Sequence, residues 1–207
     1  MKQLDAAEAA VAETLGYVFR QYPHCGRRAG LPGFAARLPA AGERSVSDLT
    51  RMRAVLLDRL AATPAGTDPD LRADLHAAAA FLALERYEVE QLGLVSPGPQ
   101  DQLAEADVAV YFDPARPGDA RIEELAAHLA ALPGFLRRSA GRLGGSLPVG
   151  VRIRCVEQAA LQAARIRETV RAAVRSLPPE RTAELAAVAE PAAAACEEFG
   201  AEHAADR

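Results

Sequence analysis

Residues 121–136 read RIEELAAHLAALPGFL, and this stretch decides the predicted fold class. Its large apolar side chains recur three or four residues apart, the spacing that places them on one face of an α-helix. Pro133 interrupts the pattern, and because proline has no backbone N–H to donate, we expect a kink there. The apolar stripe comprises Ile122, Leu125, Leu129, Leu132 and Leu136.

The same spacing recurs along most of the 207-residue chain. Aromatic residues make up only 5% and tryptophan is absent, so the branched and aromatic side chains that a β-sandwich needs are scarce. The sequence therefore predicts an all-α protein, a single-domain bundle of about six helices over residues 1–207, with a second kink at Pro191. The predicted helices cover about residues 4–22, 47–63, 68–92, 122–136, 148–177 and 178–199, with long Pro- and Gly-rich connections at 24–47 and 93–118.

No segment resembles a targeting or membrane-anchoring sequence. Asp5, Glu8 and Glu13 interrupt any apolar stretch near the N-terminus that could act as a signal peptide. No run of about 18 apolar residues is free of charge, so we expect a cytoplasmic protein with no membrane partner. The three cysteines are widely spaced and form no Cys-x-x-Cys pair, which favours free, buried thiols.

Charge is distributed unevenly over the second half of the chain. Residues 137–175 contain nine arginines and two glutamates, whereas residues 176–207 contain seven acidic residues and two arginines. These segments are predicted to be neighbouring helices that neutralise each other, and the alternative is an anion-binding face on the arginine-rich helix. Nucleic acid is a poor candidate partner, because the net charge is -4 and no aromatic residues lie between the arginines.

Several short strings occur in the order and spacing of a large bacterial family. They are the Asp48-Leu49 helix start, Phe81-Leu82-Ala83-Leu84-Glu85-Arg86-Tyr87, Ala131-Leu132-Pro133-Gly134-Phe135-Leu136 and the helix after Pro148. Together they resemble the N-terminal helical region of the family called domain of unknown function eight-eight-five, and the resemblance covers most of the chain. It implies a helical fold. Full-length members look like zinc peptidases with a His-Glu-x-x-His motif in their C-terminal half, which has no counterpart here.

Metal and cofactor motifs are absent from the sequence. No two histidines are four residues apart, so no helix can present the paired imidazoles of a zinc peptidase, and we expect no metal. Gly-rich phosphate loops and the Gly-x-Ser-x-Gly turn are also missing, and the only lysine is Lys2, so we expect no cofactor. His24 and Cys25 are adjacent, and because neighbouring side chains on an extended chain point apart, we do not expect a nucleophilic pair. The histidines are His24, His76, His128 and His203.

Glu85 is the strongest candidate for a catalytic group. It lies between Leu82 and Val89 on the apolar line of its helix, where an isolated charge is so costly to bury that the carboxyl should pair or become protonated. A protonated carboxyl would suit a general acid or base. The structural alternative is an ion pair with an arginine of the helix that follows Pro148, such as Arg152.

The remaining candidates lie near the same elements. His128 is at the margin of its apolar stripe, where it is either a catalytic group or a hydrogen-bonded boundary histidine. Tyr111 is a further catalytic candidate, and it shares with Asp113 a segment that we expect to cover a cavity. Tyr87, Asp113 and Arg152 are candidate ligand-binding residues, although a tyrosine in either place could serve packing alone.

Two functions from different classes remain open, and a pseudo-enzyme that binds no ligand is a third alternative behind them. In the first, a non-peptidase helical protein binds a small, largely apolar molecule and, if it is an enzyme, acts as a cofactor-independent cyclase, isomerase or lyase of specialised metabolism. In the second, a non-catalytic module docks a partner protein through its helical faces or the stripe of Arg167, Arg171 and Arg175. An apolar cavity of about 300 Å³ lined by Glu85 would favour the enzyme, and a filled core would favour docking. The oligomeric state stays open.

Overall fold

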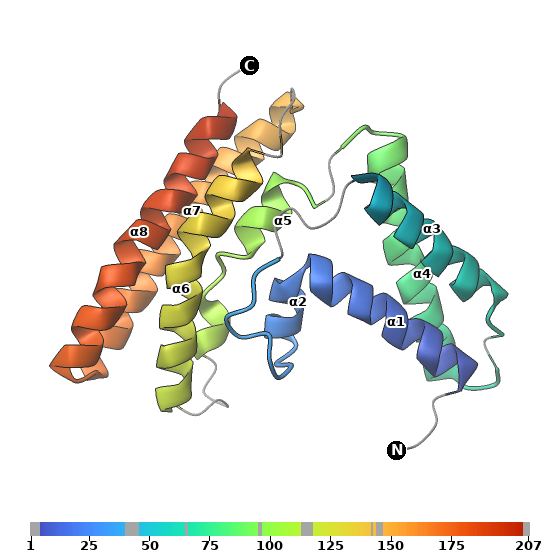
Figure 1. Cartoon of the computed structure of the whole chain (residues 1–207), viewed down its shortest axis with the longest axis horizontal. Helices are drawn as coiled ribbons and strands as arrows, with labels where there is room; N and C mark the ends of the chain where they lie inside the picture. Colours follow the sequence, from blue (N-terminus) through green and yellow to red (C-terminus); the bar gives the residue numbers. More distant parts are fainter. Residues whose placement is uncertain are drawn as a thin grey trace. The chain divides into compact units, whose positions relative to one another are not determined.

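The computed structural model describes residues 5–39, 46–64, 66–94, 97–112, 118–141, 143 and 147–204. In these ranges the chain forms eight α-helices, two short 3₁₀-helices and no strand (Figure 1). The all-α prediction is confirmed, with eight α-helices in place of about six. The chain divides into two compact units: a smaller unit of residues 1–21 and 42–96, and a larger unit of residues 22–41 and 97–207. We describe each unit by itself, and the single domain stays a prediction.

The smaller unit is formed by three helices that pack on one another, and these are α1 (Ala6–Gln21), α3 (Val46–Ala62) and α4 (Pro69–Glu90). Asp68 caps α4, because its carboxylate accepts hydrogen bonds from the backbone N–H groups of Asp70 (2.9 Å) and Leu71 (3.3 Å). Pro69 opens the helix, within a residue of the start predicted from the sequence at about residue 68. The core of this unit includes Tyr17, Leu56, Leu60, Leu75 and Leu82.

The larger unit is built on three long helices, with α8 packed against both α6 and α7 (Figure 1). Short helices precede them in the chain, and α5 packs against α6 and α7. The short helix α5 is therefore held by contacts with two of the long helices. Its elements are α2 (Pro23–Arg28), α5 (Pro99–Ala104), η1 (Ala109–Phe112), α6 (Gly118–Ala140), α7 (Val149–Ala173), η2 (Val174–Ser176) and α8 (Pro179–Ala204).

Close contact between α7 and α8 depends on small side chains. A Cβ atom at Gly200 would lie 2.6 Å from the Cβ of Ala159, so no other residue fits there without a shift of the helices. Across the same pair of helices, Arg167 forms ion pairs with Glu190 and Glu197, each at 2.6 Å. The predicted pairing of the arginine-rich helix with the acidic one is confirmed.

The structure corrects the predicted connection at residues 24–47, and it places short helices in the connection at residues 93–118. Residues 24–47 include most of α2, and residues 93–118 include α5 and η1. Pro23 opens α2, and the ring of Phe34 packs directly on Gly26, where a Cβ would meet it at 2.6 Å. This contact holds α2 in place although its sequence is too short and too rich in Gly and Pro to show helical periodicity.

The two expected kinks are not settled by the helix boundaries. Helix α6 continues through Pro133 and α8 continues through Pro191, each as one uninterrupted helix. The kinks at these prolines therefore stay predictions. Among the residues that the structure describes, no helix has the length and apolar character needed to cross a membrane.

Candidate functional site

The predicted site residues that the structure describes are divided between the two units. Glu85 and Tyr87 belong to α4 of the smaller unit, where Glu85 is 4% exposed and Tyr87 is 53% exposed. Tyr111, His128 and Arg152 belong to the larger unit. Asp113 lies outside the described residues. The expected pair of Glu85 with Arg152 would join the two units, so it stays a prediction.

Glu85 has a buried cation as its neighbour in the smaller unit. Arg53 of α3 is 2% exposed, and its Nη1 donates a hydrogen bond to the backbone carbonyl oxygen of Glu85 at 3.2 Å. The burial that the sequence predicted for Glu85 is therefore confirmed. This hydrogen bond reaches the backbone of Glu85 and not its carboxylate, so the ion pair and the catalytic role of Glu85 both stay predictions.

Tyr111 and His128 are in contact inside the larger unit. The Tyr111 hydroxyl donates to the Ala35 carbonyl oxygen and lies 3.0 Å from Nδ1 of His128, while Nε2 of His128 donates to the Glu105 carbonyl oxygen at 2.8 Å. Burial, with the nearby charge of Arg27, lowers the pKa of His128 to about 3, so its ring is neutral. Both side chains are fully buried, which favours the hydrogen-bonded boundary histidine over a catalytic one.

Glu105, which follows α5, is the centre of a buried polar cluster. Its Oε1 accepts hydrogen bonds from Nδ1 (2.8 Å) and the backbone N–H (3.2 Å) of His24, and its Oε2 accepts one from Nη2 of Arg27 at 2.7 Å. The side chains of Arg27 and Glu105 are each 1% exposed. Arg27 also donates to the carbonyl oxygens of Glu105 (3.0 Å) and Arg37 (2.6 Å), so this buried ion pair is well hydrogen-bonded.

His24 is the titratable group of this cluster that reaches the surface, with 12% of its side chain exposed. Burial by itself lowers the pKa of His24, but hydrogen bonds with the Cys25 sulfur and the Glu105 carboxylate, together with their charges, outweigh burial and raise the pKa to about 9. The imidazole is therefore cationic at neutral pH. Asp101 lies near enough for its charge to interact with His24.

The structure corrects our expectation for His24 and Cys25. Both residues lie in helix α2, not on an extended chain, and the Cys25 sulfur is 3.5 Å from Nε2 of His24. Nδ1 of the same ring is held by Glu105. Cys25, His24 and Glu105 thus form a thiol–imidazole–carboxylate chain, the arrangement in which an imidazole can activate a nucleophile.

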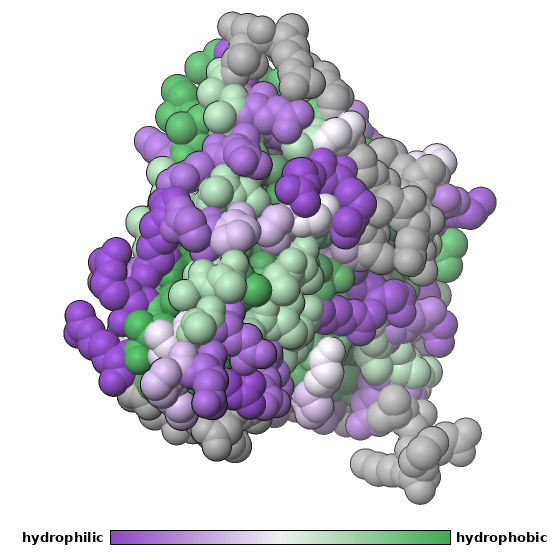
Figure 2. Space-filling view, turned by 60° about the vertical axis from the view of Figure 1, so that its left-hand side comes forward, coloured by the Kyte–Doolittle hydropathy of each residue, from purple (hydrophilic) through white to green (hydrophobic). Residues whose placement is uncertain are grey.

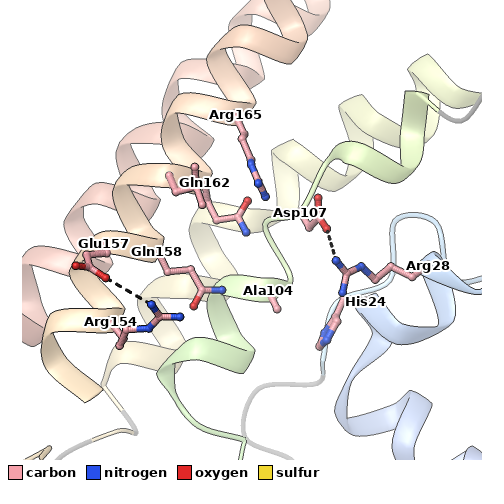
Figure 3. Close-up of a pocket in the computed structure, with 10 residues that line it drawn as sticks. His24, Arg28, Ala104, Asp107, Arg154, Glu157, Gln158, Gln162 and Arg165 are labelled. Carbon is pink, nitrogen blue, oxygen red and sulfur yellow. Dashed lines mark ion pairs between the residues drawn. The ribbon is translucent and has the colours of Figure 1, made fainter. Parts of the chain in front are cut away.

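A cavity of about 380 Å³ opens beside this chain, between α2, the end of α5 and α7 of the larger unit (Figure 3). His24 and Arg28, four residues apart on α2, both face it, and the side chains opposite come from three turns of α7. Most of its lining residues are charged or polar. The lining residues are His24, Arg28, Ala104, Asp107, Arg154, Glu157, Gln158, Leu161, Gln162 and Arg165.

Gln162 is the unusual member of the cavity wall. It is only 4% exposed, and its Oε1 has no hydrogen-bond partner among the residues that the structure describes. Figure 3 shows its amide directed from α7 toward the space that faces Asp107. A buried amide oxygen without a donor costs about 1–3 kcal/mol, so this oxygen can accept a hydrogen bond from water or from a molecule bound in the cavity.

The charges around the cavity leave a positive excess. Arg28 pairs with Asp107 at 3.5 Å and Arg154 with Glu157 at 3.8 Å, as Figure 3 shows. Arg165 has no ion pair within the described ranges, and its guanidinium points into the same space as Gln162. With the cationic His24 added, the cavity suits an anionic group. In the described part of the chain, no cluster of three His, Cys, Asp or Glu side chains could hold a metal ion.

Comparisons with protein-family models, curated proteins and solved structures find no match for this chain. The resemblance to the domain of unknown function eight-eight-five family therefore stays a prediction. The function is therefore inferred from the geometry of the larger unit.

Sequence reasoning missed Arg27, Glu105 and Gln162. One local signal was present: Glu105 stands between Ala104 and Ala106, so it interrupts an apolar stretch much as Glu85 does. Its partners are 78 and 81 residues away in the sequence, a separation that no local pattern reveals.

Proposed function

We propose that the larger unit binds a small molecule that carries an acidic group and a hydrogen-bond donor, in the cavity between α2 and α7. The observation that carries this proposal is Gln162, whose buried carbonyl oxygen has no donor within the described ranges and faces the cavity. Arg165, which projects into the same space, would bind the acidic group. The polar wall favours such a molecule over the largely apolar one that the sequence suggested.

Acid–base chemistry without a cofactor is the activity that best fits this cavity. His24 faces it and, with a pKa raised to about 9, holds a proton that it can give to a bound molecule. Glu105 fixes the orientation of the ring through Nδ1. This role belongs to His24, and the catalytic roles of Glu85, Tyr111 and His128 stay predictions.

Malate and succinate provide the sharpest test, because they differ by one hydroxyl group. We expect malate to bind more tightly than succinate, by up to about tenfold for one hydrogen bond to Gln162 Oε1. In Gln162→Leu this preference should disappear. Isothermal titration calorimetry with each acid measures both affinities.

The matched control separates the cavity from general attraction of anions. Arg165→Gln should weaken the binding of both acids, whereas Arg171→Gln, which removes an exposed arginine of α7 outside the cavity wall, should not. An equal loss of affinity in Arg165→Gln and Arg171→Gln would contradict the proposal. The absence of saturable binding of either acid up to about 10 mM would contradict it as well.

Docking of a partner protein is the second candidate, and one observation favours it. The N-terminal part of α7 exposes Val149, Ile153 and Val156 at 61%, 54% and 40%, and these residues line a second cavity of about 280 Å³. Figure 2 shows one face of the molecule, on which hydrophilic and apolar side chains are interspersed. Arg167, which the docking hypothesis used, is already paired with Glu190 and Glu197.

A further inference from the structure

Helix α2 carries a reactive group that the proposed binding function does not use. Cys25 is half-buried, whereas Cys155 and Cys196 are each 0% exposed in the packed core of the larger unit. Its sulfur lies against Nε2 of a ring that lines the cavity. Cys25 is thus a partly exposed thiol in contact with an imidazole ring, next to a cavity large enough for a small molecule.

We propose that Cys25 is the nucleophile of an acyl-transfer site, in which His24 carries the proton and Glu105 positions the ring. The geometry is continuous: 3.5 Å from Sγ to Nε2, and 2.8 Å from Nδ1 to Glu105 Oε1. Arg27 holds the other oxygen of Glu105 at 2.7 Å, so the carboxylate cannot turn away. Ordered in this way, the three groups match the roles of a nucleophile, a proton carrier and an orienting acid.

The substrate class is an ester or thioester of a small acid. In the reacting state Cys25 has given its proton to Nε2 of His24. The sulfur attacks the acyl carbon and a carbon–sulfur bond forms; the carbon–oxygen or carbon–sulfur bond of the leaving group breaks, and the leaving group takes that proton from Nε2. Water then attacks the enzyme thioester while Nε2 takes one of its protons, and the carbon–sulfur bond to Cys25 breaks. The free acid leaves and Cys25 returns to its first state, so the net reaction is hydrolysis and needs no oxidant or metal.

The link to the proposed binding function is limited to the choice of substrate. Arg28 follows His24 by four residues and faces the same cavity, and Arg165 faces it from α7, so a substrate whose acyl part bears an acidic group would be held beside Cys25. The reaction at sulfur itself rests on α2 and Glu105. It can therefore be tested with an ester that carries no acidic group.

The test uses p-nitrophenyl acetate and the full chain. We expect a burst of about one equivalent of p-nitrophenolate, followed by slower steady release, with the acetyl group mapped to Cys25 by mass spectrometry. Acetylation of Cys25 in the folded protein should be at least about 100-fold faster than in the same chain unfolded in urea at the same pH. Cys25→Ser should lose the burst and Cys155→Ala should keep it.

Two results overturn the proposal. One is acetylation that maps to residues other than Cys25, and the other is a Cys25 rate in the folded chain no faster than in urea. Both come from the unaltered protein, so they do not depend on whether a variant folds. His24→Gln should lower the acetylation rate by about 100-fold while circular dichroism stays unchanged. Failure of malate binding with a normal burst would refute the binding proposal alone.

Discussion

Replacement of Glu105 by Gln tests whether the buried cluster is organised as described. The substitution keeps the shape of the side chain and removes the charge that binds His24 and Arg27. Both side chains of the Arg27–Glu105 pair are 1% exposed, so the loss of one partner leaves a buried cation. We expect the free energy of unfolding to fall by about 3 to 5 kcal/mol, as for other broken buried pairs.

The same substitution should change the titration of His24. Its pKa, about 9 in the folded protein, should fall, because burial still opposes the charge while one of the two groups that raise the pKa is lost. Nuclear magnetic resonance of the imidazole ring measures this directly. A protein that was merely less stable would keep the high pKa of His24, so this measurement separates a positioning role of Glu105 from a structural one.

The raised pKa also predicts how stability depends on pH. Since the pKa of His24 is about 9 when folded and 6.5 in the reference state, folding favours the protonated ring. The resulting stabilisation is complete below about pH 6.5 and is lost as the pH rises through 9. The difference between these two pKa values corresponds to an upper limit of roughly 3 to 4 kcal/mol, which solvent screening of the partly exposed ring reduces.

Chemical denaturation from about pH 6 to pH 10 measures this loss as the difference between the wild type and Glu105→Gln. The difference in unfolding free energy should shrink as the pH rises, because the wild type alone loses the His24 contribution. Glu168→Gln, which removes an exposed carboxylate of α7, is the control and should behave as the wild type. A His24 pKa that stays near 9 in Glu105→Gln, or a difference that does not change with pH, would refute the reasoning.

Three further predictions concern the packing and the charges of the helices. Gly200→Ala should lower the free energy of unfolding, measured by urea denaturation, by about 1–3 kcal/mol, because the new Cβ would lie 2.6 Å from that of Ala159. Gly150→Ala is the control and should be neutral or stabilising, because the space around Gly150 is open. Equal effects of the two substitutions would contradict the close approach of α7 and α8. If the Glu85 carboxylate belongs to a buried ion pair, Glu85→Gln should lower the free energy of unfolding by about 3 to 5 kcal/mol. If the carboxylate is a general acid or base, the substitution should leave stability unchanged and reduce any turnover by about a hundredfold. No change in stability or turnover would mean that the carboxylate is solvated. Arg167→Gln should lower the melting temperature slightly, and this difference should vanish near 1 M salt because the ion pairs of Arg167 are exposed. A decrease in melting temperature that does not depend on salt would indicate that Arg167 contributes through packing.

Helix boundaries were predictable from sequence where proline and capping residues mark them. Asp68 with Pro69 gave the start of α4, and Tyr22 with Pro23 gave the end of α1 within a residue or two. These signals act over one helical turn, so a single sequence contains them in full. The burial of Glu85 followed from the same kind of local reasoning, because helical periodicity assigns each residue to a face.

The candidate site was not predictable in the same way. Helix α2 has six residues, fewer than two turns, and its position depends on the contact between Gly26 and Phe34. If residues 23–28 are taken as extended, the side chains of His24 and Cys25 are expected to point apart. Glu105 reaches His24 only because the chain returns after 81 residues, and Gln162 is distinguished by a missing partner that only three-dimensional packing reveals.

A crystal structure of the protein with malate tests the central claim most directly. The account predicts malate in the cavity between α2 and α7, with a carboxylate within hydrogen-bond distance of the Arg165 guanidinium and its hydroxyl donating to Oε1 of Gln162. Malate bound elsewhere on the protein, or a cavity that holds malate while Gln162 Oε1 receives no hydrogen bond from it, would contradict the claim.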